Sequence, residues 1–403
     1  MKTLTDTVER LGRENARTLI GGAPEGFDAL FIAALSEAGA GAGNDVMVVA
    51  RDDVSMARKA EALAFFSPAV ECLEFPAWDC LPYDRVSPRG GLVNRRIDTL
   101  AQLSDAGNKE KTGKGNTGRV VLTTVSALLQ RIPPRRGFAD SALALNTGRR
   151  LDPGELDRFL LAQGYFRSDT VMEPGEYAKR GGIVDVFPAG AEAPLRLDFF
   201  GDELDGLRVF DPATQRTTAS LTSAVLRPVS EVLLDEASIT RFRSAYRVLF
   251  AKAGDDDPLY EAVSAGHRHI GMEHWLPLFH DRLETILDYL PGAHVVLDHQ
   301  AEEARDARLD LIGEYYLTRR GFADKKPQGG TVQSGAVYHP VPPEAMFLDA
   351  REWDDLLSRH AVSQLSPFAV PLSADASDAG GRGGHDFADV RVRPEANVFD
   401  AFA

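Results

Sequence analysis

The chain has 403 residues, of which 44% are hydrophobic, and this length and composition predict several folded domains rather than a disordered polypeptide. Its formal net charge of -15 disfavours autonomous DNA binding, because such binding needs clustered Lys and Arg side chains that displace counterions. There is no uninterrupted apolar run of about 18 residues, and the polar beginning, MKTLTDTVERLGRENAR, lacks the apolar core of a secretory signal, so we expect a cytoplasmic protein without membrane contact.

From Arg17 to about Arg131, apolar segments alternate with helix-like segments. The apolar segments are TLIGG, DVMVVA, VECLEFP and VVLTT, and the helix-like ones are FDALFIAALSEAGA and SMARKAEALAFF. Strands separated by helices predict a parallel sheet with crossover helices, so we assign residues 1–140 to the first part of an α/β domain. The polar, glycine-rich stretch Asp105–Arg119 is expected to be a solvated loop.

Two cysteines and three aromatic residues lie in and beyond the third predicted strand. Cys72 and Cys80 fit no common metal-binding spacing, and we expect both to be buried thiols. Phe75, Trp78 and Tyr83 are expected to be core aromatics rather than a platform for base stacking, because the protein is acidic.

Residues 141–231 have a different pattern and predict a small α+β insert domain. One helix is expected at Pro153–Gln163, followed by short strands in GGIVDVF, LRLDFF and LDGLRVF. Gly201 and Asp202 supply a turn between the last two strands, which we therefore expect to form an antiparallel hairpin.

The α/β pattern returns in residues 232–372. A helical segment, ASITRFRSAYRVLFAKA, precedes an apolar strand, AHVVLDH, and a long amphipathic run extends from Gln300 to Arg320. We assign residues 373–403 to a linker or the start of a further segment, because Ser373–Asp386 is of low complexity.

Four histidines occur close together, but they do not predict a metal site. They lack the H-x-x-x-H spacing that places two ligands on one helix face, and a structural or solvent-exposed role is favoured. These residues are His267, His269, His274 and His280.

The first strand-loop-helix, TLIGGAPEGFDAL, resembles a phosphate-binding loop that has degenerated. The working pattern is G-x-x-x-x-G-K-[ST], in which the lysine contacts the β and γ phosphates. Gly21 and Gly26 keep the glycine spacing of this pattern, and Gly22 lies between them. Phe27 and Asp28, however, replace the lysine and the hydroxyl residue. An aspartate would repel phosphate, so we expect no nucleotide cofactor and no catalytic residue.

The segment VVLDHQ is the candidate for the second half of such a nucleotide site. Asp298 is present, but His299 stands where a catalytic glutamate would orient water. An aspartate that caps the following helix is the favoured alternative to a metal-binding aspartate. Another short motif, Gly113-Lys114-Gly115, precedes a strand and ends in glycine, so we do not expect it to bind phosphate.

Long segments of the chain resemble the bacterial transcription-repair coupling factor (Mfd) family. FPAWDCLPYDRVSP, Asn94-Arg95-Arg96-Ile97 and TTVSALLQRIPP resemble its first domain, and Gly164–Thr217 resembles its second domain almost throughout. GMEHWLPLF and ILDYLPGAHVVLDH extend the resemblance to roughly residues 17–370. It implies a degenerate P-loop, helicase-like parallel-sheet domain that is split by the insert, in the order of the UvrB-like domains 1a, 2 and 1b.

The resemblance implies a module without catalysis that recruits UvrA and so links stalled RNA polymerase to nucleotide excision repair. In the full-length family, RNA polymerase and double-stranded DNA bind to domains that lie beyond this chain. The alternative is a degenerate helicase or ATPase related to UvrB that acts on damaged DNA, although the UvrB family has an intact phosphate loop and a long aromatic hairpin. An acidic regulator with another repair partner is a third possibility.

The resemblance also implies which residues contact UvrA, namely Arg167 and Arg180, since guanidinium groups can hold carboxylates through two hydrogen bonds. The alternative is that each arginine is merely solvated or pairs locally with Asp169, Glu173 or Glu176.

Strand alternation adds Phe187 to the expected contact surface. If Val184 and Val186 point inward, Phe187 lies on the opposite face with Ile183 and Asp185, unless Gly181-Gly182 introduces a bulge. An outward phenylalanine beside two arginines would be a typical binding hot spot.

Overall fold

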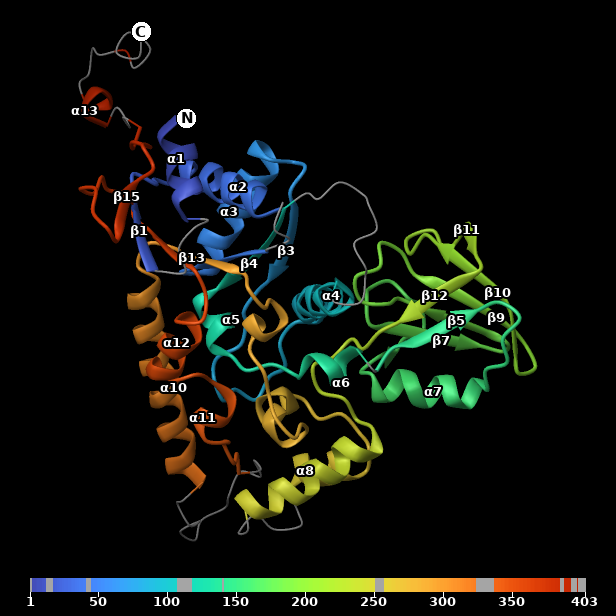
Figure 1. Ribbon diagram of the computed structural model, residues 1–403. Helices are drawn as coiled ribbons and strands as arrows, with labels where there is room; N and C mark the ends of the chain where they lie inside the picture. The colour runs from blue at the N-terminus through green and yellow to red at the C-terminus, as the bar shows by residue number, and fades with distance from the viewer. Residues whose placement is uncertain are drawn as a thin grey trace.

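The fold is a parallel-sheet scaffold from which a smaller β domain projects on one side (Figure 1). We describe it from a computed structural model, which covers residues 2–11, 17–40, 45–106, 118–139, 141–250, 257–323, 337–384, 388–392 and 397. Gly113-Lys114-Gly115 and most of the loop expected at Asp105–Arg119 lie outside the described residues.

The scaffold contains a seven-stranded sheet in which all neighbouring strands are parallel, in the order β15-β1-β14-β13-β2-β4-β3. This arrangement confirms the predicted α/β class with its inserted domain. The strands are β1 (Arg17–Gly21), β2 (Val46–Ala50), β3 (Glu71–Phe75), β4 (Arg119–Thr124), β13 (His294–Leu297), β14 (Val362–Leu365) and β15 (Ala376–Asp378).

Helices cover both faces of this sheet, which explains why the central strand β2, VMVVA, is apolar and buried throughout. On β2, Val48 packs into one buried cluster with Phe31, whereas Met47 and Val49 pack into another with Ile97. The helices of the first face are α1 (Lys2–Leu11), α2 (Phe27–Ala40) and α3 (Asp53–Phe66). Those of the second face are α4 (Gly90–Ala106), α5 (Val125–Leu129), α10 (Ala301–Ala323) and α12 (Ala350–Leu357).

The chain leaves the scaffold after α6 (Arg135–Ala139) and returns to the middle of the same sheet. The returning strands β13 and β14 lie between β1 and β2, so the two parts of the scaffold share one core. Before β13 the chain builds a helical lobe with its own buried cluster, which includes Tyr83, Phe242 and Trp275. This part of the chain contains α8 (Glu236–Leu249), α9 (Pro258–Ser264), η1 (Met272–Leu278) and η2 (Ile286–Tyr289), and α11 (Pro343–Met346) follows α10.

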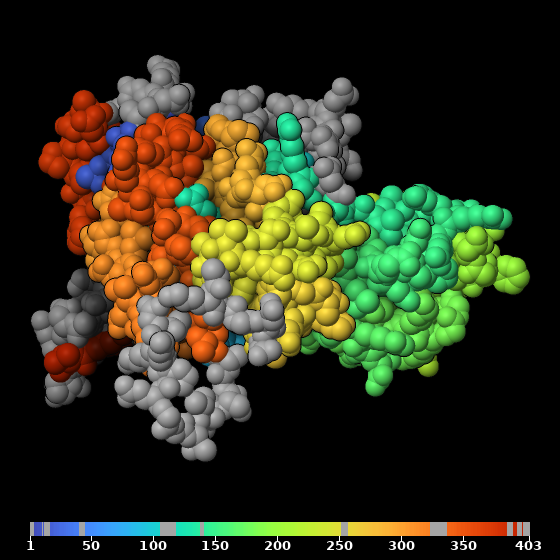
Figure 2. Space-filling view, turned by 90° about the horizontal axis from the view of Figure 1, so that it is seen from below, coloured from blue at the N-terminus to red at the C-terminus, as the bar shows by residue number. Residues whose placement is uncertain are grey.

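The insert domain forms a separate lobe that is visible at one side of the molecule (Figure 2). Its six-stranded sheet has the order β11-β10-β9-β8-β7-β6, and β5 pairs with β12 where the chain enters and leaves the domain. The expected hairpin is confirmed as β9 and β10. The elements are β5 (Leu143–Asn146), α7 (Pro153–Ala162), β6 (Phe166–Arg167), β7 (Glu176–Arg180), β8 (Ile183–Val186), β9 (Leu195–Phe200), β10 (Glu203–Phe210), β11 (Thr217–Leu221) and β12 (Ser223–Leu226).

Two expectations about the scaffold are wrong. Ser373–Asp386 is not simply a linker, because Ala376–Asp378 forms β15, which pairs in parallel with β1 at one edge of the sheet. Cys72 is exposed rather than buried, because β3 is the opposite edge strand and only one of its faces is covered. Cys80 is partly buried. A short helix, α13 (Ala388–Arg391), follows β15.

The aromatic residues near β3 pack as expected, although not in one cluster. Phe75 is buried in the core of the sheet, and Tyr83 is buried in the helical lobe. Trp78 is half-buried and packs against the same lobe. In the part of the chain that the structure covers, no helix is both long and apolar enough to cross a membrane.

Candidate functional site

A cavity of about 430 Å³ lies at the carboxyl ends of the scaffold strands, where the sequence places a degenerate nucleotide site. Its walls come from the β1–α2 loop, the beginning of α3 and the residues after β13. Ligands of open parallel sheets bind at this edge, because loops and helix amino termini meet there. The fold therefore brings Gly26 and Asp298 to one pocket, whereas Gly22 is not among the residues that line it.

Two amides of the β1–α2 loop already donate to the segment that follows β14. The Gly22 amide donates to the Phe368 carbonyl at 2.8 Å, and the Ala23 amide donates to the Ser366 carbonyl at 2.9 Å. Gly22 has a φ of +61°, and Asp378 at the end of β15 lies so close that a side chain at Gly22 would collide with it. The segment that follows β14 thus takes the hydrogen bonds that a phosphate would require.

Asp28 occupies the amino terminus of α2, where a phosphate would otherwise accept hydrogen bonds. Its Oδ1 accepts from the Gly26 amide at 2.9 Å and from the Ala29 amide at 2.8 Å. The amides of Phe27 and Asp28 both donate to the Pro24 carbonyl at 3.0 Å. A carboxylate in this position satisfies the helix end and repels other anions.

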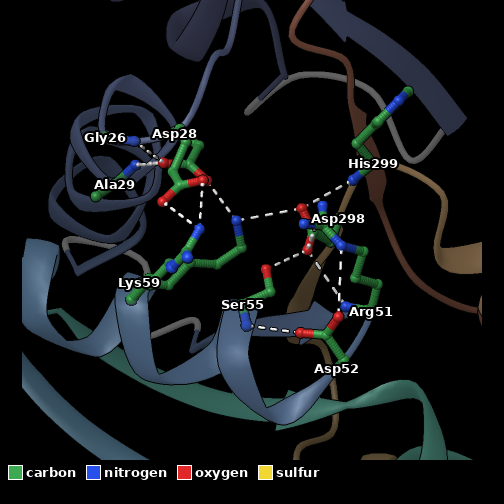
Figure 3. Close-up of polar contacts among 11 residues, drawn as sticks. Gly26, Asp28, Ala29, Arg51, Asp52, Ser55, Lys59, Asp298 and His299 are labelled. Carbon is green, nitrogen blue, oxygen red and sulfur yellow. Dashed lines mark hydrogen bonds and ion pairs between the residues drawn. The ribbon is translucent and has the colours of Figure 1, made fainter.

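Lys59 contacts both acidic residues of the pocket (Figure 3). Its ammonium group donates a short hydrogen bond to Asp28 and lies 3.2 Å from Oδ1 of Asp298. All three side chains are buried, with exposed fractions of 5–6%. Burial alone would lower the pKa of Lys59, but the carboxylates of Asp298 and Asp28 outweigh it and raise this pKa.

Asp298 also has hydrogen-bond partners other than Lys59. The Ser55 hydroxyl donates to its Oδ2 at 2.5 Å, and the amides of Arg51 and His299 donate at 3.2 and 2.9 Å. Burial acts to raise the pKa of Asp298, but Lys59 and the hydrogen bonds from Ser55 and the Arg51 amide lower it overall. The expected helix cap is wrong in detail, because the Asp298 side chain bonds to Lys59, Ser55, Arg51 and His299 rather than to α10.

These residues do not fit a metal–nucleotide complex. The amides of Gly22, Ala23 and Gly26 already have acceptors. Asp28 lies where phosphate would bind, and Lys59 neutralises the aspartate that would hold a metal. Sequence reasoning missed Lys59, although there was a signal. Lys59 falls between Met56 and Leu63 on the buried stripe of α3, where a lysine needs an acidic partner.

The residues expected to contact UvrA lie in the insert domain, near the β6 edge of its sheet. Arg167 is exposed on β6, beside Phe166, whose exposed fraction is 53%. Arg180 is exposed at the end of β7, and its guanidinium donates to the carbonyl of Asp169 and to Oγ1 of Thr170. The two arginines thus flank the segment that joins β6 to β7.

The local ion pairs that offered an alternative explanation for these arginines are not formed. Arg180 bonds to the backbone of Asp169, and the Glu176 carboxylate accepts from the amides of Met172 and Glu173. Within the described residues, Arg167 forms no ion pair. Its guanidinium is therefore available to a partner.

The expectation that Phe187 is exposed is wrong. Val184 and Val186 share one buried face as predicted, and Phe187 lies on the other, but that face is covered as well. Phe187 packs with Val171 and Phe210 and is only 6% exposed. Alternation correctly assigned the side of the strand, but it could not reveal that a second small core covers this side.

The histidine cluster is dispersed by the fold. His274 is buried and donates to the Val86 carbonyl at 3.3 Å, and His280 lies against the Glu231 carbonyl at 3.3 Å. His267 is exposed. In the described ranges, no three His, Cys, Asp or Glu side chains are grouped so that they could hold a metal ion.

Comparison with known proteins finds matches to the insert domain and to most of the chain. Residues 143–231 match the family described as the UvrB interaction domain. The transcription-repair-coupling factor of Haemophilus influenzae is 35% identical over 295 residues, which cover 73% of this chain and 24% of that protein. The Escherichia coli protein of the same name is 31% identical over 353 residues, which cover 87% of this chain and 28% of that protein. The chain therefore spans about a quarter of the length of these relatives.

Proposed function

We propose that this chain, which is homologous to the amino-terminal part of transcription-repair-coupling factor and includes a UvrB interaction domain, recruits UvrA through that domain. The observation that carries the proposal is the pair Phe166 and Arg167 on β6. Both side chains are exposed at the edge of the matched domain, and the arginine has no ion-pair partner among the described residues. Phenylalanine and arginine are both enriched at protein interfaces, and arginine is also enriched among binding hot spots.

Arg180 extends this surface. Its guanidinium is anchored on the backbone carbonyl of Asp169 and the side-chain hydroxyl of Thr170, which fixes its position without neutralising its charge. A positioned arginine loses less conformational entropy when it binds a carboxylate than a freely rotating one does. Arg167 and Arg180 would therefore hold acidic groups of UvrA, while Phe166 takes the role that the sequence suggested for Phe187.

The scaffold would serve as a platform without catalysis in this function. In the cavity at its strand ends, the Gly22 and Ala23 amides already have acceptors and Lys59 pairs with Asp28 and Asp298, which argues against the alternative of a degenerate helicase or ATPase. The remaining three-quarters of the longer relatives would supply the contacts to RNA polymerase and double-stranded DNA. Under this proposal the protein acts in the cytoplasm in transcription-coupled nucleotide excision repair.

A titration of purified UvrA with the wild-type chain and with Arg167→Ala, Arg180→Ala and the double variant tests the proposal. Each single substitution should weaken binding by about 1–3 kcal/mol, or about 5- to 150-fold, if the contacts are desolvated. Arg150→Ala is the matched control, since Arg150 is an exposed arginine of the same domain with an 83% exposed side chain. Equal affinities for the wild type and the double variant would reject the assignment.

A further inference from the structure

Lys59 lies where three connections of the scaffold meet (Figure 3). Asp28 lies in the first turn of α2, Lys59 lies in the helix that follows β2, and Asp298 follows directly after β13. The ammonium group contacts both carboxylates, and Ser55, one turn earlier on α3, donates to Asp298 as well. One buried cation thus joins three segments that are distant in the sequence.

The charge at this point requires a cation. If the ammonium were absent, two carboxylates that are each 6% exposed would repel one another. The other cation that lies near them is Arg51, which is 38% exposed and 3.9 Å from Oδ2 of Asp298, so it compensates Asp298 only weakly and leaves Asp28 unpaired. In a working nucleotide site of this fold, magnesium and the phosphates occupy this region, and the metal compensates the acidic residue at the end of the strand. Here the compensating charge is part of the chain.

We propose that Lys59 is a built-in cation that replaces the metal–nucleotide complex, holds α2, α3 and the end of β13 together and excludes divalent metal ions from the cavity. The scaffold is then stable without a bound nucleotide, although its fold places a pocket where one would bind. This inference concerns a different part of the molecule from the UvrA surface, so each proposal can fail without the other.

The neighbouring residue Arg58 is a basic residue of the same helix that is not buried, so it separates the role of burial from the role of positive charge. Arg58 pairs with Glu25 at the mouth of the cavity, and the two side chains are 56% and 64% exposed. Water screens such an exposed pair, so substitution of Arg58 should not create a site that binds another cation. Arg58 and Lys59 therefore form a matched pair of positions for an experiment.

Thermal unfolding of the full chain with EDTA, Mg²⁺, Mn²⁺ or Mg²⁺–ATP is the test. The wild type and Arg58→Met should have a Tm that none of these additions changes. Lys59→Met should have a lower Tm in EDTA and a rise in Tm that saturates with Mn²⁺ or Mg²⁺ concentration. The metal would take the place of the ammonium between two carboxylates and the Ser55 hydroxyl, which are the oxygen ligands that these ions prefer.

A double variant covers the case in which Lys59→Met does not fold. Lys59→Met combined with Asp28→Asn removes one carboxylate together with the lysine, so it should yield folded protein with a higher Tm than Lys59→Met in EDTA and a weaker metal response. Equal metal responses of wild type and Lys59→Met would overturn the proposal. So would a double variant that is no more stable than the single one, because charge compensation would then not be the role of Lys59.

Discussion

Arg96 and Glu231 form an ion pair in which both side chains are removed from solvent, with exposed fractions of 0% and 1%. Nε and Nη2 of Arg96 donate to the two carboxylate oxygens at 2.5 and 3.1 Å, and Nη1 donates to the Pro76 carbonyl at 2.8 Å. Arg96 comes from α4 of the scaffold, whereas Glu231 is the last residue of the matched UvrB interaction domain. The pair therefore fastens the insert domain to the scaffold at the point where the chain returns.

Substitution of Arg96 by alanine should destabilise the chain by about 3–5 kcal/mol, because it leaves Glu231 as an uncompensated buried charge. Arg95 is the control, since it forms an ion pair with Glu74 but its side chain is 60% exposed. Arg95→Ala should cost less than about 1 kcal/mol. The free energies of unfolding in urea give both values, and equal costs for the two substitutions would contradict the assigned role of Arg96.

The two phenylalanines of the insert domain should respond in opposite ways to substitution. Phe166→Ala should weaken UvrA binding by about tenfold or more and leave Tm unchanged, because Phe166 is an exposed hot-spot candidate. Phe187→Ala should destabilise the domain by about 3–5 kcal/mol, because it opens a cavity in the small core with Val171 and Phe210. Parallel measurements of affinity and thermal unfolding separate the two effects. A stable Phe187→Ala that no longer binds UvrA would restore the original expectation for this residue.

Stability should fall as the solution is acidified, in part because of His274. Burial lowers the pKa of His274 to about 4 from its ordinary value of 6.5. Between these two values the unfolded chain binds a proton that the folded chain does not, so stability is lost as pH falls through this window. One such histidine contributes a slope of up to about 1.4 kcal/mol per pH unit.

Urea unfolding between pH 7 and pH 4.5 measures this slope. His274→Gln should make it shallower, because the proton that binds to the unfolded state is removed. The exposed His267 is the control, and His267→Gln should leave the slope unchanged. Burial also lowers the pKa of His294 to about 4, and His294 is present in both variants. Part of the pH dependence should therefore remain even in His274→Gln. An unchanged slope in His274→Gln would show that other groups determine the acid sensitivity.

Much of the architecture could be predicted because it is recorded in local patterns. Alternating apolar and helical segments predict the parallel sheet, and Gly201 and Asp202 predict the β9–β10 hairpin. The position of the returning strands could not be predicted in this way. Strand order depends on tertiary packing, so nothing local reveals that β13 and β14 lie between β1 and β2.

The candidate sites were predictable only in part, for the same reason. Loss of the phosphate-binding lysine is visible from Phe27 and Asp28, but the contact of Asp28 with Lys59 joins residues 31 positions apart. Phe187 was assigned to the correct side of its strand, yet its burial depends on Phe210 from another strand. The pattern along one segment indicates which of its side chains share a face, whereas the residues that cover this face come from elsewhere in the chain.

The most direct test of the proposed role is a binding experiment in which purified UvrA binds to the immobilised chain and UvrB is then added at increasing concentrations. The chain itself should need no nucleotide in this experiment. If this chain binds UvrA through its UvrB interaction domain, and UvrB uses the same surface of UvrA, UvrA should bind saturably to the chain and UvrB should displace it completely. Absence of UvrA binding, or binding that saturating UvrB leaves unchanged, would contradict the account.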